Sequence, residues 1–160
     1  MLEDGTLDAT VGFKEPPGRK VNAVYKEFVK VPLVCICPAG HPLAEKEEVS
    51  LSELEKEKLV LFVPSRSAFP AAQVQEQLMG DRPPTEFYFC ESAESIIVLV
   101  TAGYGISVLP AYLIPETPQI RAVPVTDGEP FSFGVYYRTI QGNPALKSFI
   151  RCAKDFFASK

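Results

Sequence analysis

Residues 91–110 read ESAESIIVLVTAGYGISVLP and combine a helix pattern with a strand pattern. Ser92 is a residue type that often caps a helix, because its hydroxyl accepts a hydrogen bond from a backbone N–H of the first turn. Gly103 suits the left-handed conformation that ends many helices, and Gly105 allows close backbone packing. The stretch therefore predicts a helix after Ser92, a glycine turn, and a short buried strand ending at Pro110. Because the glycine pair follows a helix instead of opening one, it does not match a dinucleotide-binding loop.

Short apolar runs alternate with helix-like segments along the rest of the chain. The expected strands are 9–13, two segments within 23–38 that join near Lys30, 59–63, 85–91, 106–110, 120–125 and 131–138. The expected helices are a short one opened by a capping box of Ser52 and Glu55, one over 67–80, the one after Ser92, and one over 144–158. This alternation predicts an α/β architecture with a mainly parallel sheet.

The C-terminal segment carries the clearest helix pattern. Asn143 is a good N-cap, and Pro144 suits the first helical position. Apolar residues then recur at helical spacing and predict one buried stripe, which consists of Leu146, Phe149, Ile150, Ala153, Phe156 and Phe157.

Composition and charge narrow the class of protein. The chain has 160 residues, of which 46% are apolar and 22% charged, as in ordinary globular domains. Its net charge of −4 and its scattered basic residues argue against direct nucleic-acid binding by this chain, because phosphate contacts need clustered Lys and Arg. No apolar stretch approaches the roughly 18 residues of a membrane span, and the N-terminus does not resemble a secretory signal. We therefore expect no membrane partner and a cytoplasmic location.

The cysteines and the single histidine give no indication of catalysis or of a cofactor. Cys35 and Cys37 stand two apart in an apolar run, so both should face the same side of a strand, too close for an ordinary disulfide. The pair is expected to be reduced and to consist of small apolar core residues. Cys90 and Cys152 are the other two cysteines of the chain. His41 has no partner at a useful spacing, and no nucleophile or acid–base pair is recognisable. We expect no metal, no cofactor and no enzymatic activity.

The order of several short motifs resembles one known family. The chain reads LEDGTLD at residues 2–8, HPLA at 41–44 and AGYGISVLP at 102–110, in an order that covers nearly all of it. These motifs resemble the effector-binding (substrate-binding) domain of LysR-type transcriptional regulators. The resemblance implies a bilobal fold similar to the type 2 periplasmic binding proteins: two α/β lobes, two crossing strands, and a small molecule in the cleft between the lobes. Residues 1–32 with 130–160 would form a partial first lobe, and residues 33–129 the second lobe.

The beginning of the chain departs from the family pattern. Family members open with a winged helix-turn-helix, a linker helix and a strand–helix–strand unit of the first lobe, and none of these is recognisable here. The first lobe is therefore expected to be incomplete at its N-terminus. The chain is expected to be either a fragment of a longer regulator or a shortened product that borrows or lacks that half.

The resemblance directs attention to two strand ends. Clefts in such folds lie at the carboxyl ends of strands and at helix N-termini, where free N–H groups favour an anion. Ser65, Arg66 and Ser67 follow the strand expected at 59–63, and an arginine can form a bidentate pair with a carboxylate. Each of the three could instead be a helix cap or a solvated surface residue.

The second strand end and the first strand supply the remaining candidates. Glu91 and Ser92 follow the strand at 85–91; Ser92 could simply cap its helix, and Glu91 would repel an anion but could hold an amine. Gly12 and Phe13 end the first strand, where the family's crossing region faces the cleft. Phe13 could stack on an apolar part of a ligand or could serve only packing.

These observations favour a regulatory sensor of a small, anionic metabolite that forms a homodimer. Two alternatives stay open. One is a truncated interaction module that dimerises with a full-length regulator and modulates it. The other is a solute-binding protein of the same fold, which the lack of a recognisable signal peptide disfavours.

Overall fold

A computed structural model describes residues 2, 4–15, 22–63 and 72–158. The chain divides into two compact units. Unit 1 comprises Met1–Val31 and Phe131–Lys160, and unit 2 comprises Pro32–Pro130. The two units are described separately.

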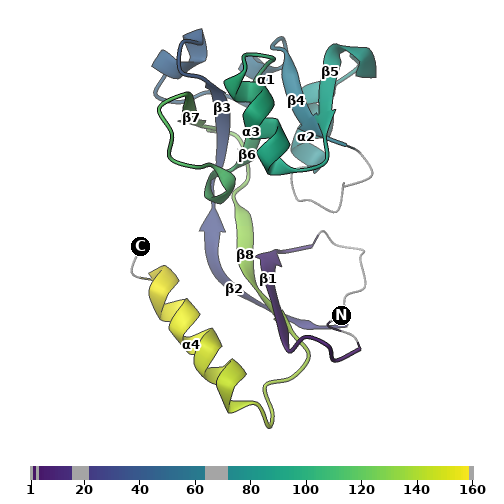
Figure 1. The fold of residues 1–160 in the computed structure, drawn as a ribbon, viewed down its shortest axis with the longest axis vertical. Helices are drawn as coiled ribbons and strands as arrows, with labels where there is room; N and C mark the ends of the chain where they lie inside the picture. Colours follow the sequence, from purple (N-terminus) through teal and green to yellow (C-terminus); the bar gives the residue numbers. More distant parts are fainter. Residues whose placement is uncertain (1, 3, 16–21, 64–71, 159–160) are drawn as a thin grey trace. The chain divides into compact units, whose positions relative to one another are not determined.

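Unit 1 is built on a three-stranded antiparallel sheet in the order β1-β8-β2 (Figure 1). Its strands are β1 (Ala9–Phe13), β2 (Val24–Val31) and β8 (Phe131–Tyr137). In the register, Gly12 pairs with Gly134. A Cβ atom on Gly134 would collide with the backbone carbonyl of Lys26, so only glycine fits at this point in the central strand.

Helix α4 (Pro144–Ala158) packs on this sheet. The Asn143 Oδ1 accepts a hydrogen bond from the Leu146 N–H at 2.9 Å, which confirms the predicted N-cap. Leu146 and Ile150 are buried against Val135 of β8. The remainder of the predicted stripe is partly wrong, because Phe149 and Phe156 are 45% and 54% exposed. Leu146 and Ile150, four residues apart, share the buried face of the helix, whereas Phe149 and Phe156 lie on a neighbouring side.

Unit 2 contains two small sheets. In the first, β3 (Leu33–Pro38) lies between β6 (Ser107–Pro110) and β7 (Ile120–Pro124), and both pairings are antiparallel. In the second, β4 (Leu59–Phe62) and β5 (Phe87–Cys90) pair in parallel. Among the strands of the described residues, β4–β5 is the only parallel pair, so the expected mainly parallel sheet is wrong. Short apolar runs indicate burial but carry no information on strand direction.

The helices of unit 2 are short. They are α1 (Leu51–Leu54), α2 (Ala72–Met79) and α3 (Ala93–Thr101), with single 3-10 turns η1 (Pro42–Glu45), η3 (Pro84–Glu86) and η4 (Ala111–Leu113). The predicted capping box is wrong by two residues: Ser50 is the cap, and the Glu53 carboxylate accepts from the Ser50 N–H at 2.8 Å. The pair Ser52 and Glu55 has the same spacing, but the observed register buries Leu51 and Leu54. Of the helix expected over 67–80, the first residues lie outside the described part.

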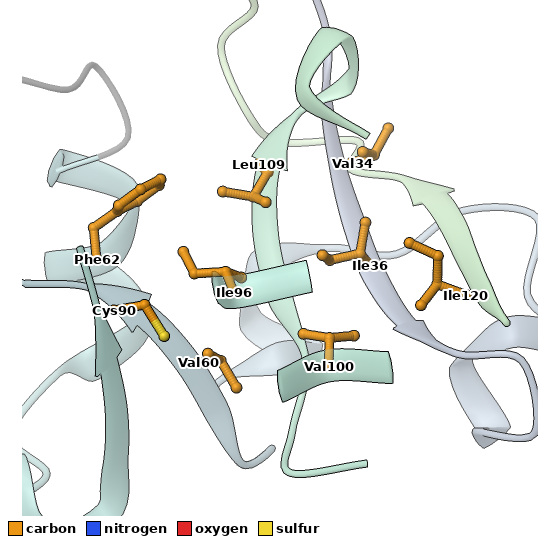
Figure 2. Close-up of a cluster of buried hydrophobic side chains, with 9 residues drawn as sticks. All are labelled: Val34, Ile36, Val60, Phe62, Cys90, Ile96, Val100, Leu109 and Ile120. Carbon is orange, nitrogen blue, oxygen red and sulfur yellow. The ribbon is translucent and has the colours of Figure 1, made fainter. Parts of the chain in front are cut away.

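The main core of unit 2 lies beneath α3. Ile96 and Val100 of α3 are fully buried against strand side chains, as Figure 2 shows. The cluster as a whole consists of Val34, Ile36, Val60, Phe62, Cys90, Ile96, Val100, Leu109 and Ile120. Gly103 ends the helix with φ +83°, in agreement with the prediction. A Cβ atom on Gly105 would lie 2.5 Å from the Lys58 carbonyl oxygen, which confirms the predicted close packing.

The predicted core position of Cys35 and Cys37 is confirmed. Cys35, Cys37 and Cys90 are buried thiols. Cys152, on α4, is exposed. In the part of the chain that the structure describes, no helix has the length and apolar character needed to cross a membrane.

Candidate ligand-binding site

The parallel pairing of β4 with β5 brings two strand ends to one edge of unit 2. Phe62 and Cys90, the last residues of these strands, are paired, and the Val63 N–H donates to the Cys90 carbonyl at 2.9 Å. Carboxyl ends of adjacent parallel strands are where α/β folds place ligands. Val63 and the start of α3 after Cys90 lie at this end of the two strands, which we call the β4–β5 edge.

Three of the predicted site residues cannot be placed. Ser65, Arg66 and Ser67 lie outside the described residues. Their predicted contacts with a ligand stay predictions.

Ser92 lies at the β4–β5 edge and caps α3. Its backbone is extended, with φ −139° and ψ 158°, and its Oγ accepts a hydrogen bond from the Ser95 N–H at 3.2 Å. The Ser92 and Ser95 hydroxyls also lie 3.1 Å apart and share a hydrogen bond. The predicted N-cap is confirmed, and it already uses one acceptor of the Ser92 hydroxyl.

Two carboxylates surround the first turn of α3. Glu91 is exposed directly before the cap, and Glu94 lies in the first turn. Hydrogen bonds from the Glu94 backbone N–H and from the Ser92 side chain lower the pKa of the Glu94 carboxyl, so it is ionised at neutral pH. These negative charges occupy the place that an anionic ligand would take at a helix N-terminus. On its own, this start of α3 suits a hydroxyl or an amine better than an anion.

The sequence analysis missed Gln75, which holds α2 against the same edge. Its side chain is 8% exposed, and its Oε1 accepts a hydrogen bond from the Phe62 N–H at 2.7 Å. This bond satisfies the last backbone donor of β4 and fixes where α2 lies relative to the strand end. A signal was present: Gln75 stands three residues before Leu78, and both are buried on one face of α2.

Gly12 and Phe13 belong to unit 1, whereas the other candidates belong to unit 2. A Cβ atom on Gly12 would meet nothing within 4 Å, so the space above it is open. The Phe13 ring lies edge-on to Phe133 at a centroid distance of 5.2 Å and to Phe131 at 6.1 Å. These contacts favour a packing role for Phe13.

His41 has a structural place. Its Nδ1 accepts a hydrogen bond from the Leu43 N–H at 3.2 Å, which caps the turn η1. Its Nε2 lies 3.6 Å from a carboxylate oxygen of Glu57. Among the residues that the structure describes, no group of three or more His, Cys, Asp and Glu side chains is arranged to hold a metal ion.

Comparison with known proteins relates this chain to a family of transcriptional regulators. A family model described as the LysR substrate binding domain matches residues 1–158. The chain is 29% identical over 156 residues to the uncharacterized HTH-type transcriptional regulator YnfL of Escherichia coli strain K12, which covers 92% of this chain and 50% of that protein. It is 28% identical over 156 residues to the RuBisCO operon transcriptional regulator of Allochromatium vinosum, covering 93% of this chain and 50% of that protein. The chain thus spans about half the length of the curated relatives it matches.

The fold is also similar to solved structures. The BenM effector binding domain, solved with its effector benzoate, aligns with a TM-score of 0.79 at 22% sequence identity. The alignment covers 99% of this chain and 72% of that one. At this level of identity the likeness concerns the fold, which is that of a mixed α/β effector domain.

Proposed function

The chain belongs to the LysR substrate-binding-domain family, and from this premise we propose that it senses a small, anionic metabolite for a transcriptional regulator. The family is regulatory and non-enzymatic, so the chain is an effector domain and no enzyme.

The β4–β5 edge is the observation that supports the proposed site. Two strand ends and the N-terminus of α3 lie there, and Gln75 fixes α2 at the same edge. Backbone N–H groups at such an edge can donate hydrogen bonds to a ligand, and these groups carry no net charge of their own. We assign Ser92 and Glu91 to this site, together with Ser65, Arg66 and Ser67 from the segment that follows β4.

The sign of the ligand charge depends on that segment. Glu91 and Glu94 would repel an anion at the start of α3. Arg66 would supply the compensating positive charge and a bidentate geometry for a carboxylate. In the proposed arrangement, Arg66 and serine hydroxyls bind the anion. Glu91 selects among ligands by the other polar groups that they carry.

Sensing requires that the ligand prefer one of two arrangements of the protein. We assign residues 1–32 and 130–160 to a partial first lobe and residues 33–129 to a second lobe, with Gly12 and Phe13 on the first-lobe side of the cleft. Ligand binding would change lobe or subunit packing in a homodimer. The setting would be the cytoplasm, and DNA contacts would be made by other parts of a full-length regulator.

A second candidate function is an interaction module that pairs with a full-length regulator. It is favoured by the apolar side chains that unit 1 exposes, which are Leu7, Val11, Val24, Phe149 and Phe156. In the described part of the chain, β1 also pairs on one side only, with β8. An unpaired strand edge beside apolar residues favours association with another chain.

The proposed function is tested by thermal melting of the chain with a panel of small aliphatic and aromatic carboxylates, benzoate included. A ligand that binds only the folded state raises the melting temperature with concentration, by an amount that corresponds to about 2.7 kcal/mol at a hundredfold excess over Kd. We expect at least one acid to act in this way. If amines stabilise the chain and no carboxylate does, the anionic part of the proposal is wrong.

The variant Glu91→Gln sharpens the test. It removes a negative charge at the β4–β5 edge, so we expect tighter binding of the stabilising acid. Glu116→Gln removes an exposed carboxylate elsewhere in unit 2 and is the matched control. Equal affinity changes in both variants would show that the ligand responds to total charge and does not bind at this edge.

A further inference from the structure

A pocket in unit 2 lies away from the β4–β5 edge. It has a volume of about 410 Å³ and is lined by residues 56–58 and by Arg82 and residues 85–88. Lys58 directly precedes β4 and Glu86 directly precedes β5, and the strands begin at the pair Leu59 and Phe87. The pocket is therefore at the amino ends of the two strands, opposite the edge at which they finish. Pockets of this volume commonly hold small molecules.

Arg82 is held in a fixed position in this pocket. Its two terminal nitrogens donate to the Glu57 carbonyl and to the Leu78 carbonyl, both at 2.9 Å. Its guanidinium carbon lies 4.7 Å from the ring centroid of Phe87, which is buried. These contacts with described residues use two of the five N–H donors of the guanidinium and remove its rotamer freedom. An ordered guanidinium loses little entropy when it binds an oxyanion.

The pocket lining carries a small excess of positive charge on a chain that is acidic overall. Lys56 and Lys58 are exposed on its rim beside Arg82, while the chain carries a net charge of −4. Two carboxylates, Glu57 and Glu86, also line it, so the three cations exceed the carboxylates by one. Three cations around one concave surface attract an anion more strongly than any one of them alone.

One side of the pocket is aromatic. The Tyr88 ring is 45% exposed, and it is held edge-on by Tyr104 at a centroid distance of 5.3 Å. A supported, accessible ring of this kind provides a surface for the apolar part of a ligand.

We propose that this pocket is a second ligand site, which binds a small molecule that joins an oxyanion, carboxylate or phosphate, to a flat apolar group. Arg82, Lys56 and Lys58 bind the oxyanion, and Tyr88 contacts the apolar group. The site is independent of the effector proposed at the β4–β5 edge.

The experiment is an NMR titration of the isotope-labelled chain with inorganic phosphate, phenyl phosphate and benzoate. We expect saturable amide shifts at residues 56–58 and 85–88, with phenyl phosphate or benzoate binding more tightly than inorganic phosphate. The double variant Lys56→Gln and Lys58→Gln should weaken binding about tenfold, because two nearby charges are lost. Lys26→Gln with Lys30→Gln removes two exposed lysines from unit 1 and should leave the affinity within about twofold of the original.

Two further variants separate this site from its surroundings. Tyr88→Ala should abolish the advantage of phenyl phosphate over inorganic phosphate while leaving inorganic phosphate binding unchanged. Ser92→Ala should leave all shifts at the pocket unchanged, so failure of the proposed effector site does not decide this one. The inference is overturned if no probe gives saturable shifts at the pocket, or if both double-lysine variants weaken binding equally.

Discussion

Gly105 occupies a position at which a single added methyl group has no room. A Cβ atom there would lie 2.5 Å from the Lys58 carbonyl oxygen and 2.9 Å from its carbon, both of which are backbone atoms and cannot turn aside. We therefore expect Gly105→Ala to lower the free energy of unfolding by about 2–3 kcal/mol, as in other overpacked sites. Urea denaturation measures the change.

Gly40→Ala is the control for this prediction. A Cβ atom at Gly40 would meet nothing within 4 Å. We expect a change below about 1 kcal/mol, of either sign. Equal destabilisation by both substitutions would show that the contact with the Lys58 backbone does not decide the effect at Gly105.

Glu53 makes the stability of unit 2 sensitive to acid. A hydrogen bond from Lys46, followed by bonds from the Ser50 N–H and side chain, lowers the pKa of Glu53 from 4.5 to about 2. Because the folded pKa is the lower one, the stabilisation is present above pH 4.5 and disappears as the pH falls towards 2. We expect Glu53→Gln to destabilise the chain at neutral pH and to differ little from the original chain near pH 2. Urea midpoints across this pH range provide the measurement.

Glu55→Gln is the matched control, since Glu55 is the carboxylate that the sequence pattern alone would place in the capping box. If Glu55→Gln reduces the acid sensitivity and Glu53→Gln does not, the helix begins two residues later than in this structure.

The four thiols should react at very different rates in the folded chain. Burial raises the pKa of the Cys35, Cys37 and Cys90 thiols, which keeps them protonated and poorly nucleophilic. Cys152 is exposed. We expect a disulfide reagent to modify one thiol rapidly without denaturant and all four in urea, and Cys152→Ser to remove the rapid phase. Rapid loss of two or more thiols from the native chain would contradict the described burial.

At the scale of single elements, helix α4 carries both buried and exposed apolar residues. Ile150 is 5% exposed against β8, whereas Phe149 next to it is 45% exposed. We expect Ile150→Ala to cost about 2–4 kcal/mol and Phe149→Ala less than about 1 kcal/mol, measured by denaturation of the isolated chain. A larger cost at Phe149 would mean that this side of the helix is covered, for example by a second copy.

The ends of the long helices could be predicted from sequence because they depend on local chemistry. Ser92, Asn143 and Gly103 each act through bonds or torsion angles within a few residues, and all three predictions are confirmed. The capping box of α1 was misplaced because two Ser and Glu pairs share one spacing, and only burial of Leu51 and Leu54 against distant residues distinguishes them. Local patterns identify a cap but do not choose between equivalent ones.

Strand direction and long-range polar contacts could not be predicted in the same way. The apolar run of β3 is buried between two antiparallel neighbours, while a similar run in β4 pairs in parallel. The hydrogen bond from the Phe62 N–H to Gln75 and the one from Arg82 to the Glu57 carbonyl also join residues that only the tertiary fold brings together. A helical glutamine or a loop arginine is usually a surface residue. The spacing of Gln75 from Leu78 indicates the buried face of α2 but not the partner at Phe62, and the partners of Arg82 have no local signal at all.

At the scale of the whole molecule, the order of motifs carried more information than any one of them. LEDGTLD, HPLA and AGYGISVLP are individually weak, but their order indicates the LysR effector domain, and the family model matches residues 1–158. The motifs predict the fold better than the ligand site. They belong to turns and core strands, whereas ligand contacts depend on loop residues.

The most direct test of the central claim is an amide NMR titration of the chain with the carboxylate that raises its melting temperature most. If the effector binds at the β4–β5 edge, the largest saturable shifts will fall on Val63 and on Glu91, Ser92 and the first turn of α3. They will be reduced by Arg66→Gln and enhanced by Glu91→Gln. Shifts confined to unit 1 or to the pocket around Arg82, or the lack of saturable binding by every acid of the panel, would contradict the account.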